Sequence, residues 1–143
     1  MKTILKLSLI VFTTMILLSS CTLWDTLFGP AYLGDWEFSV DDGSYQTHYV
    51  WSFGYESFQF RGEQINGSTK IPYQEVIGIF SDDGKNNMII TYKKGRFFNP
   101  TASQWTEWMD INIPPYKAGY KVDGDVLILS SENGTSTTLT RVK

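Results

Sequence analysis

In the stretch YLGDWEFSV, residues 32–40, two kinds of side chain alternate. Small or apolar residues occupy every second position: Gly34, Trp36, Phe38 and Val40. Polar residues lie between them: Asp35, Glu37 and Ser39. Successive side chains of a β-strand point to opposite faces, so this stretch predicts a strand with one buried face and one solvated face.

The same period of two continues through most of the chain. In the next run, alternate positions carry Tyr45, Thr47, Tyr49, Trp51 and Phe53. Turn dipeptides separate the runs: Asp42-Gly43, Asn66-Gly67, Asp83-Gly84, Asp123-Gly124 and Asn133-Gly134. Such dipeptides favour the positive φ of tight hairpins. The predicted strands lie near residues 32–40, 45–53, 56–65, 69–80, 87–94, 104–113, 116–122, 125–131 and 135–142.

Eight or nine short strands in meander order favour an all-β fold, an antiparallel up-and-down β-barrel. Closure also removes the exposed sheet edges through which strands of different molecules aggregate. The first and last strands of such a barrel are neighbours, so Trp36 on the first and Arg141 on the last are expected to meet at one end. A guanidinium over an indole face contributes about 0.5–2 kcal/mol, and its N–H groups can donate to loop carbonyls.

Gly34-Asp35-Trp36, together with Arg141 near the end of the chain, resembles the lipocalins. In that family a G-x-W sequence opens the first strand, and an arginine near the end of the barrel covers the tryptophan. The ending GYKVDGDVLILSSENGTSTTLTRVK is also similar to small bacterial lipocalin-like domains. The resemblance spans residues 31–142 and implies a lipocalin-like barrel. Four apolar residues upstream either form the short plug that lipocalins place under the barrel or lie against the membrane surface: Leu23, Trp24, Leu27 and Phe28.

The first 20 residues, MKTILKLSLIVFTTMILLSS, have the order of a secretory signal peptide: basic residues, an apolar run and small residues. The apolar run from Leu7 to Leu18 is shorter than the roughly 20 residues that a membrane-spanning helix needs. We therefore expect residues 1–20 to be cleaved. The alternative is a buried N-terminal helix, which would show a polar face that this run lacks.

Leu18-Ser19-Ser20-Cys21 resembles the lipobox of bacterial lipoproteins, whose cysteine is lipidated and becomes the first residue after cleavage. Cys21 is the only cysteine and has no partner for an intramolecular disulfide. Several acyl chains, at about 0.8 kcal/mol per buried methylene, hold a protein durably at a membrane. By the same resemblance, Thr22 implies an outer-membrane protein, which we expect to face the periplasm. Residues 21–30 would be the lipidated N-terminus and tether, and residues 31–143 the barrel domain.

Charge and residue types argue against several functions. The first 20 residues hold two of the 12 basic residues and no acidic one, so 10 basic and 15 acidic residues remain, a net charge of −5. This argues against nucleic acid, which requires basic patches. The only histidine, His48, lies on the polar side of its strand. We therefore expect neither a catalytic triad nor a zinc site, and we expect no cofactor. We do not expect the protein to be an enzyme. The remaining catalytic possibility is a side chain of Glu75 or Glu107 that points inward, because an apolar interior would raise the pKa of its carboxyl group.

Two functions remain open for the barrel. The first is a binding module for a small hydrophobic or amphipathic ligand, and the second is a structural or interaction protein of the cell envelope whose aromatic side chains fill the barrel. We expect the walls of any cavity to include Tyr49, Trp51, Phe58, Phe60, Tyr92 and Trp105. Phe97 and Phe98 follow the basic run Lys93-Lys94-Gly95-Arg96, interpreted as a hairpin end, and are predicted to lie in a long loop that covers one mouth.

Overall fold

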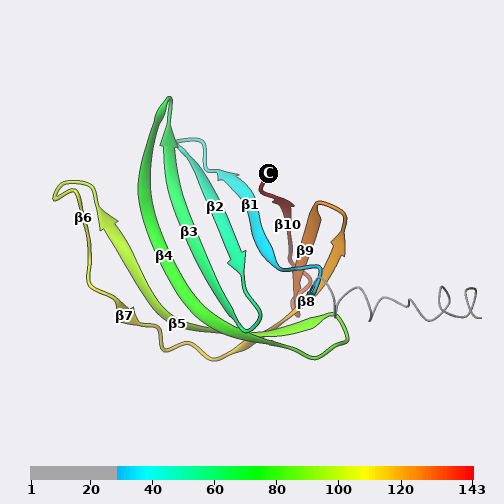
Figure 1. Cartoon of the computed structure of the whole chain (residues 1–143). Helices are drawn as coiled ribbons and strands as arrows, with labels where there is room; N and C mark the ends of the chain where they lie inside the picture. Colours follow the sequence, from blue (N-terminus) through cyan, green and yellow to red (C-terminus); the bar gives the residue numbers. More distant parts are fainter. Residues whose placement is uncertain (1–28) are drawn as a thin grey trace, which may run out of the picture. The chain divides into compact units, whose positions relative to one another are not determined.

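Eight antiparallel strands form the barrel in chain order (Figure 1). The computed structural model describes residues 29–143. The barrel strands are β1 (Gly34–Asp41), β2 (Gln46–Phe53), β3 (Ser57–Asn66), β4 (Thr69–Asp82), β5 (Asn87–Asn99), β8 (Tyr116–Asp123), β9 (Val126–Ser131) and β10 (Ser136–Arg141). Two strands of two residues each, β6 (Gln104–Trp105) and β7 (Met109–Asp110), pair with β5.

The predictions for the N-terminus lie outside the described residues. They are the signal peptide, the lipidation of Cys21, and the plug or membrane contact of Leu23, Trp24, Leu27 and Phe28. In residues 29–143 the structure contains no helix that is long and apolar enough to cross a membrane. Residues Tyr32–Lys143 form a compact unit of their own.

The barrel closes because its first strand has a neighbour on each side. β1 pairs with β2 along its whole length and with β10 at Trp36 opposite Arg141 and Glu37 opposite Thr140. On the other side of the barrel, β5 pairs with β4 and, through residues 87–90, with β8. The predicted antiparallel up-and-down barrel is therefore confirmed, and its strand number and order are those of a lipocalin-like barrel.

The predicted turns are confirmed as well. Each of the five turn dipeptides joins two neighbouring strands, and its glycine has a positive φ of 57–86°. Glycine adopts this conformation without the steric penalty of a Cβ atom. Seven of the predicted strands have ends within two residues of those observed. The two exceptions lie next to each other in the chain, at β5 and in the segment that follows it.

A continuous strand over residues 104–113 was predicted wrongly. Only β6 and β7 pair with β5 in this segment. The guanidinium carbon of Arg96 lies 4.7 Å from the ring centroid of Trp105 and 4.6 Å from that of Trp108. Residues three apart in a strand point to opposite faces, so both tryptophans can contact one arginine only if the chain leaves the extended conformation between them.

The prediction of a loop at Phe97 and Phe98 is also wrong. β5 continues to Asn99, and residues 94–97 pair with residues 74–77 of β4. The basic run from Lys93 to Arg96 is therefore the middle of a long strand instead of a hairpin end. The chain turns only after Asn99, whose side-chain oxygen accepts hydrogen bonds from the N–H groups of Thr101 and Ala102.

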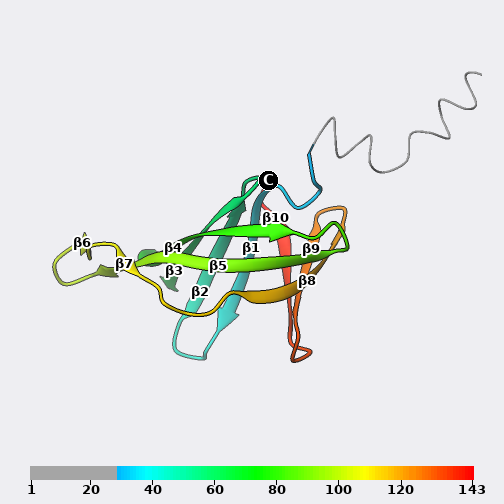
Figure 2. The same ribbon diagram turned by 90° about the horizontal axis from the view of Figure 1, so that it is seen from below.

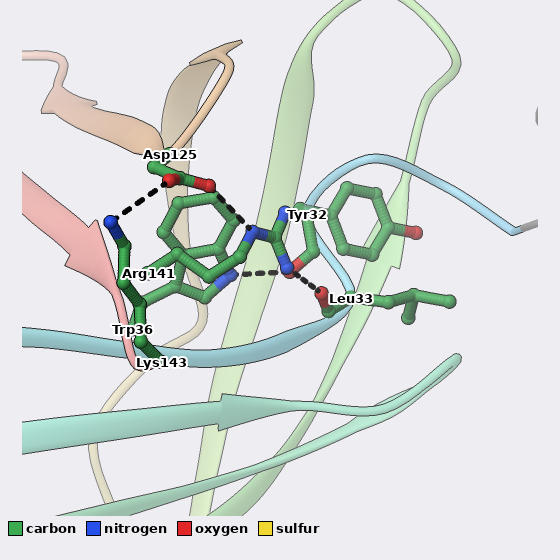
Figure 3. Close-up of polar contacts among 6 residues, drawn as sticks. All are labelled: Tyr32, Leu33, Trp36, Asp125, Arg141 and Lys143. Carbon is green, nitrogen blue, oxygen red and sulfur yellow. Dashed lines mark hydrogen bonds and ion pairs between the residues drawn. The ribbon is translucent and has the colours of Figure 1, made fainter.

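Trp36 and Arg141 meet at one end of the barrel, as predicted (Figure 3). Trp36 is fully buried, and the guanidinium carbon of Arg141 lies 4.1 Å from the centroid of its ring. The indole N–H of Trp36 donates to the carbonyl oxygen of Tyr32 at 2.7 Å. Nη1 of Arg141 donates to the carbonyl oxygen of Leu33 at 2.9 Å, and its Nε lies 3.8 Å from the carboxylate of Asp125. The two side chains thus tie the first and last strands to the segment that precedes β1.

Packed side chains fill the barrel next to this pair. Tyr32 lies edge-on to Phe53, Phe80 and Tyr120, with ring centroids 5.4–6.4 Å apart. The other fully buried side chains of this core are Met88, Ile90, Leu127 and Leu139. One end of the barrel is therefore solid.

Candidate binding site

A cavity of about 380 Å³ lies inside the barrel beyond this core. On β1, Phe38 follows Trp36 on the inward face, and on β10, Thr137 precedes Leu139 on the inward face; Phe38 and Thr137 both line the cavity. The complete lining comes from six strands and the β9–β10 turn: Phe38, Trp51, Phe60, Tyr116, Ala118, Leu129, Ser130, Ser131, Asn133, Thr135 and Thr137.

An aromatic wall crosses β1, β2 and β3. The rings of Phe38, Tyr49 and Phe60 stack in series, with 5.0 Å between the centroids of each pair. Trp51 lies edge-on to Phe60 at 5.0 Å and stacks on Phe58 at 5.2 Å. Rings held in this way offer a large, rigid apolar surface to a ligand.

The opposite wall carries a pair of neutral hydroxyl groups. The phenol oxygens of Tyr92 and Tyr116 form a hydrogen bond of 3.2 Å, and Tyr116 lines the cavity. Burial raises the pKa of Tyr92, and the hydrogen bond with Tyr116 raises it further. Burial also raises the pKa of Tyr116. Both groups are therefore uncharged at neutral pH. Beside them, the small side chain of Ala118 leaves room in the cavity.

The β9–β10 turn forms a polar rim. The Ser131 hydroxyl donates to the carbonyl oxygen of Thr135 at 3.1 Å and also hydrogen-bonds the side-chain oxygen of Asn133. The same Asn133 oxygen accepts the backbone N–H of Thr135 at 3.0 Å. Because these bonds hold the turn in place, its polar groups are positioned before any ligand arrives.

The structure divides the aromatic residues that were predicted for the cavity wall. Trp51 and Phe60 line the cavity. Tyr49 and Tyr92 do not line the cavity but contact residues that do. Tyr49 stacks on Phe60, and Tyr92 forms a hydrogen bond with Tyr116. Phe58 is 3% exposed and belongs to the packed core.

Phe97, Phe98 and Trp105 lie outside the cavity lining. Phe97 is 45% exposed and lies edge-on to Tyr73, with 6.3 Å between the ring centroids. Phe98 and Trp105 contact each other edge-on at 5.4 Å, where β6 pairs with β5. Strand pairing therefore places these three aromatic residues along the extension of β5.

Glu75 lies on the outer face of the barrel instead of the inner one. Its carboxylate accepts a hydrogen bond of 2.8 Å from Nε of Arg96 and lies 2.6 Å from Nη2. Glu75 shares a face with Ile77 and Ile79, as its spacing indicated, but Ile79 is 47% exposed. Glu107 is exposed to solvent. Glu75 thus forms an ion pair with Arg96 on the outer face and does not contribute a carboxylate to the interior.

His48 lies on the polar face of β2, as predicted. Its Nε2 is 3.0 Å from the carboxylate of Glu37 on the neighbouring strand, and the two groups share a hydrogen bond. Among residues 29–143, no group of three or more His, Cys, Asp or Glu side chains lies close enough together to hold a metal ion.

Sequence reasoning missed most of the lining because it selected only large aromatic residues, and it also missed two of those, Phe38 and Tyr116. The missed residues are Phe38, Tyr116, Ala118, Leu129, Ser130, Ser131, Asn133, Thr135 and Thr137. A signal for the rim was present in the last hairpin. Leu127, Leu129 and Ser131 form one inward row, and Leu139, Thr137 and Thr135 form the next. In each row leucine gives way to a hydroxyl residue near the turn, where the row leaves the core.

A second depression, of about 400 Å³, lies on the outer face of the barrel across β2, β3 and β4. Its lining includes the outward side chains Gln59, Ile77 and Ile79. This depression rests on one face of a sheet, whereas six strands surround the inner cavity. We therefore take the inner cavity as the candidate site.

Neither a scan against models of protein families nor a search of curated proteins finds a match. What the cavity can bind is therefore inferred from its size, its lining and its charge.

Proposed function

We propose that this protein is a membrane-anchored lipoprotein whose barrel binds a small amphiphilic molecule without catalysing a reaction. The observation that carries the binding proposal is a cavity of about 380 Å³ with aromatic walls and a polar rim. Ligand pockets typically measure roughly 300–1,000 Å³ and combine apolar walls with a few placed polar groups. An eight-stranded antiparallel barrel is compatible with a lipocalin-like binding fold.

The volume of the cavity limits the size of the ligand. At about 30 Å³ for each water-sized group, the cavity holds roughly a dozen non-hydrogen atoms. A medium-chain amphiphile such as decanol fits this limit. Its alkyl chain would lie along the aromatic wall, and its head group would reach the rim at Ser131 and Thr135.

Decanol is expected to bind saturably to a soluble chain that begins at Thr22, and to change the fluorescence of Trp51. Trp51 lines the cavity, so its indole reports directly on what enters. Thr137→Phe, which fills the cavity from β10, should weaken binding by about tenfold or more, since a ligand and a phenyl ring cannot share the space. Fluorescence titration measures both effects, and Trp51→Phe identifies the source of the signal.

Thr138→Phe is the matched control. Thr138 is the next residue on the same strand and is exposed, so the same substitution there leaves the cavity open. We expect this variant to bind decanol like the unmodified chain. Equal weakening in the two variants would place the binding elsewhere, and the absence of saturable binding in the unmodified chain would refute the proposal.

A structural or interaction lipoprotein of the cell envelope is the alternative. It is favoured by large apolar side chains on the surface, each 36–49% exposed: Ile79, Ile89, Trp108, Met109 and Ile113. Where such side chains lie side by side, they form a surface that binds other proteins or membranes. The decanol titration separates the two functions, because a folded barrel that does not bind decanol favours this alternative.

The anchoring part of the proposal rests on the lipobox-like sequence that ends at Cys21. Cys21→Ser should leave an uncleaved precursor or a soluble chain, because serine offers no thiol for lipidation. Fractionation and mass spectrometry of the N-terminus measure this, with Ser19→Ala as the control that keeps the cysteine and a small residue. A free, unmodified Cys21 in protein extracted from membranes would refute the anchor. We place the anchored protein in the outer membrane, facing the periplasm, on the basis of Thr22.

A further inference from the structure

We propose that the cavity selects an amphiphile with an uncharged head group, such as an alcohol or an ester, and rejects one with an ionised head group. The inference rests on the proposed binding function and specifies the class of ligand. It follows from the charge of the lining, the charge around the mouth and the hydrogen-bonding capacity of the rim.

No charged side chain is among the residues that line the cavity. Its polar groups are the hydroxyls of serine, threonine and tyrosine and the carboxamide of Asn133. Lys117 is exposed and lines a separate surface depression, which also contains the carboxylate residue Glu132. An anionic head group inside the cavity would therefore lose its hydration without meeting a cation of the lining, which is strongly unfavourable.

The turns at the mouth are acidic. Figure 2 shows the β1–β2 and β9–β10 turns at the same end of the barrel, away from the C-terminus. Asp41 and Asp42 lie at the first turn and Glu132 lies in the second, all exposed. The backbone N–H groups of Tyr45 and Ser44 lower the pKa of Asp42, so this carboxylate stays ionised. These charges repel an approaching carboxylate or phosphate.

The rim can satisfy a neutral head group. The hydroxyl groups of Thr135 and Thr137 both donate and accept hydrogen bonds, so they offer partners to an alcohol or to an ester carbonyl. The hydroxyl hydrogen of Ser131 is already donated within the turn, but its oxygen can accept from an alcohol. A cationic head group could approach the acidic turns, but within the cavity it would find only neutral acceptors. An uncharged head group alone keeps its hydrogen bonds without the cost of burying a charge.

The test compares four ligands built on a ten-carbon chain with different head groups: decanol, methyl decanoate, decanoate and decylammonium. Titration is done at neutral pH with the chain that begins at Thr22, which contains the whole compact unit Tyr32–Lys143. We expect decanol and methyl decanoate to bind at least about tenfold more tightly than either ion. Decanoate or decylammonium binding as tightly as decanol would overturn the inference and leave the binding function intact. No binding by any of the four would overturn both.

A charge introduced into the lining provides a second measurement. Thr137→Lys places an ammonium group on the inward row of β10 and should raise the affinity for decanoate relative to decanol by about tenfold. Thr138→Lys, one residue away and exposed, adds the same charge outside and should leave the order of affinities unchanged. Circular dichroism checks that both variants fold. If Thr137→Lys does not fold, the comparison of the four ligands on the unmodified chain decides the inference.

Discussion

Trp36→Ala is expected to lower the free energy of unfolding by about 3–5 kcal/mol, the usual range for truncation of a large buried aromatic side chain. Trp36 has no exposed surface. Its ring supports the guanidinium of Arg141, and its N–H satisfies the carbonyl of Tyr32. Alanine would leave a cavity at the closed end of the barrel, remove a hydrogen bond, and loosen the contact between the first and last strands.

Denaturant unfolding of the chain that begins at Thr22, followed by circular dichroism, measures this loss. Trp108→Ala is the matched control, because it removes the same side chain from a site that is 36% exposed and that also contacts an arginine. Its cost should be about 1 kcal/mol, near the value of an exposed cation–π contact. A loss for Trp36→Ala no larger than that for Trp108→Ala would contradict the role of Trp36 as the centre of the core.

Gly78→Ala is expected to destabilise the barrel by about 1–3 kcal/mol through overpacking. A Cβ atom at Gly78 would lie 2.4 Å from the carbonyl oxygen of Thr91 and 2.5 Å from the ring of Phe58. The first contact is with backbone of the paired strand β5 and the second with a core ring that is 3% exposed. Neither neighbour can move freely, so the pairing of β4 with β5 must shift.

Gly119→Ala is the control for this substitution. Gly119 also lies in a barrel strand, but the nearest heavy atom to an added Cβ is 3.7 Å away, an ordinary contact. Its effect should stay within about 0.5 kcal/mol of the unmodified chain. Thermal or denaturant unfolding of both variants measures the difference. Equal stabilities of the Gly78→Ala and Gly119→Ala variants would show that the close approach of Phe58 does not exclude a larger side chain at position 78.

The local sequence determined the strands of this protein and, through them, the barrel. Side-chain alternation set which residues share a face, as at Trp36 and Phe38, and the Asp-Gly and Asn-Gly pairs set where the chain reverses. Both signals act between residues that are close in the chain. With strands in meander order, closure brings the first against the last, so the contact of Trp36 with Arg141 also follows from sequence.

The tertiary structure alone decided which face of β4 is inward. Both faces of this strand carry apolar side chains, since Val76 and Phe80 alternate with Ile77 and Ile79. A period of two identifies the two sets without saying which is inside. Pairing with β3 and β5 decides it, because Val76 lies opposite Phe60 and Phe80 lies opposite Ile90. Glu75, Ile77 and Ile79 are therefore outside.

The tertiary structure also decided where the barrel is filled and where it is hollow. Phe58 and Phe60 occupy the same inward row of β3, yet Phe58 is packed in the core and Phe60 lines the cavity. The difference depends on what the opposite wall provides at each level. Leu127 and Leu139 pair with each other and fill the level of the core, whereas Thr137, two residues nearer the β9–β10 turn, leaves space. Cavity volume is a property of side chains that are distant in sequence and meet across the barrel, so it depends on their packing and not on the pattern within any one strand.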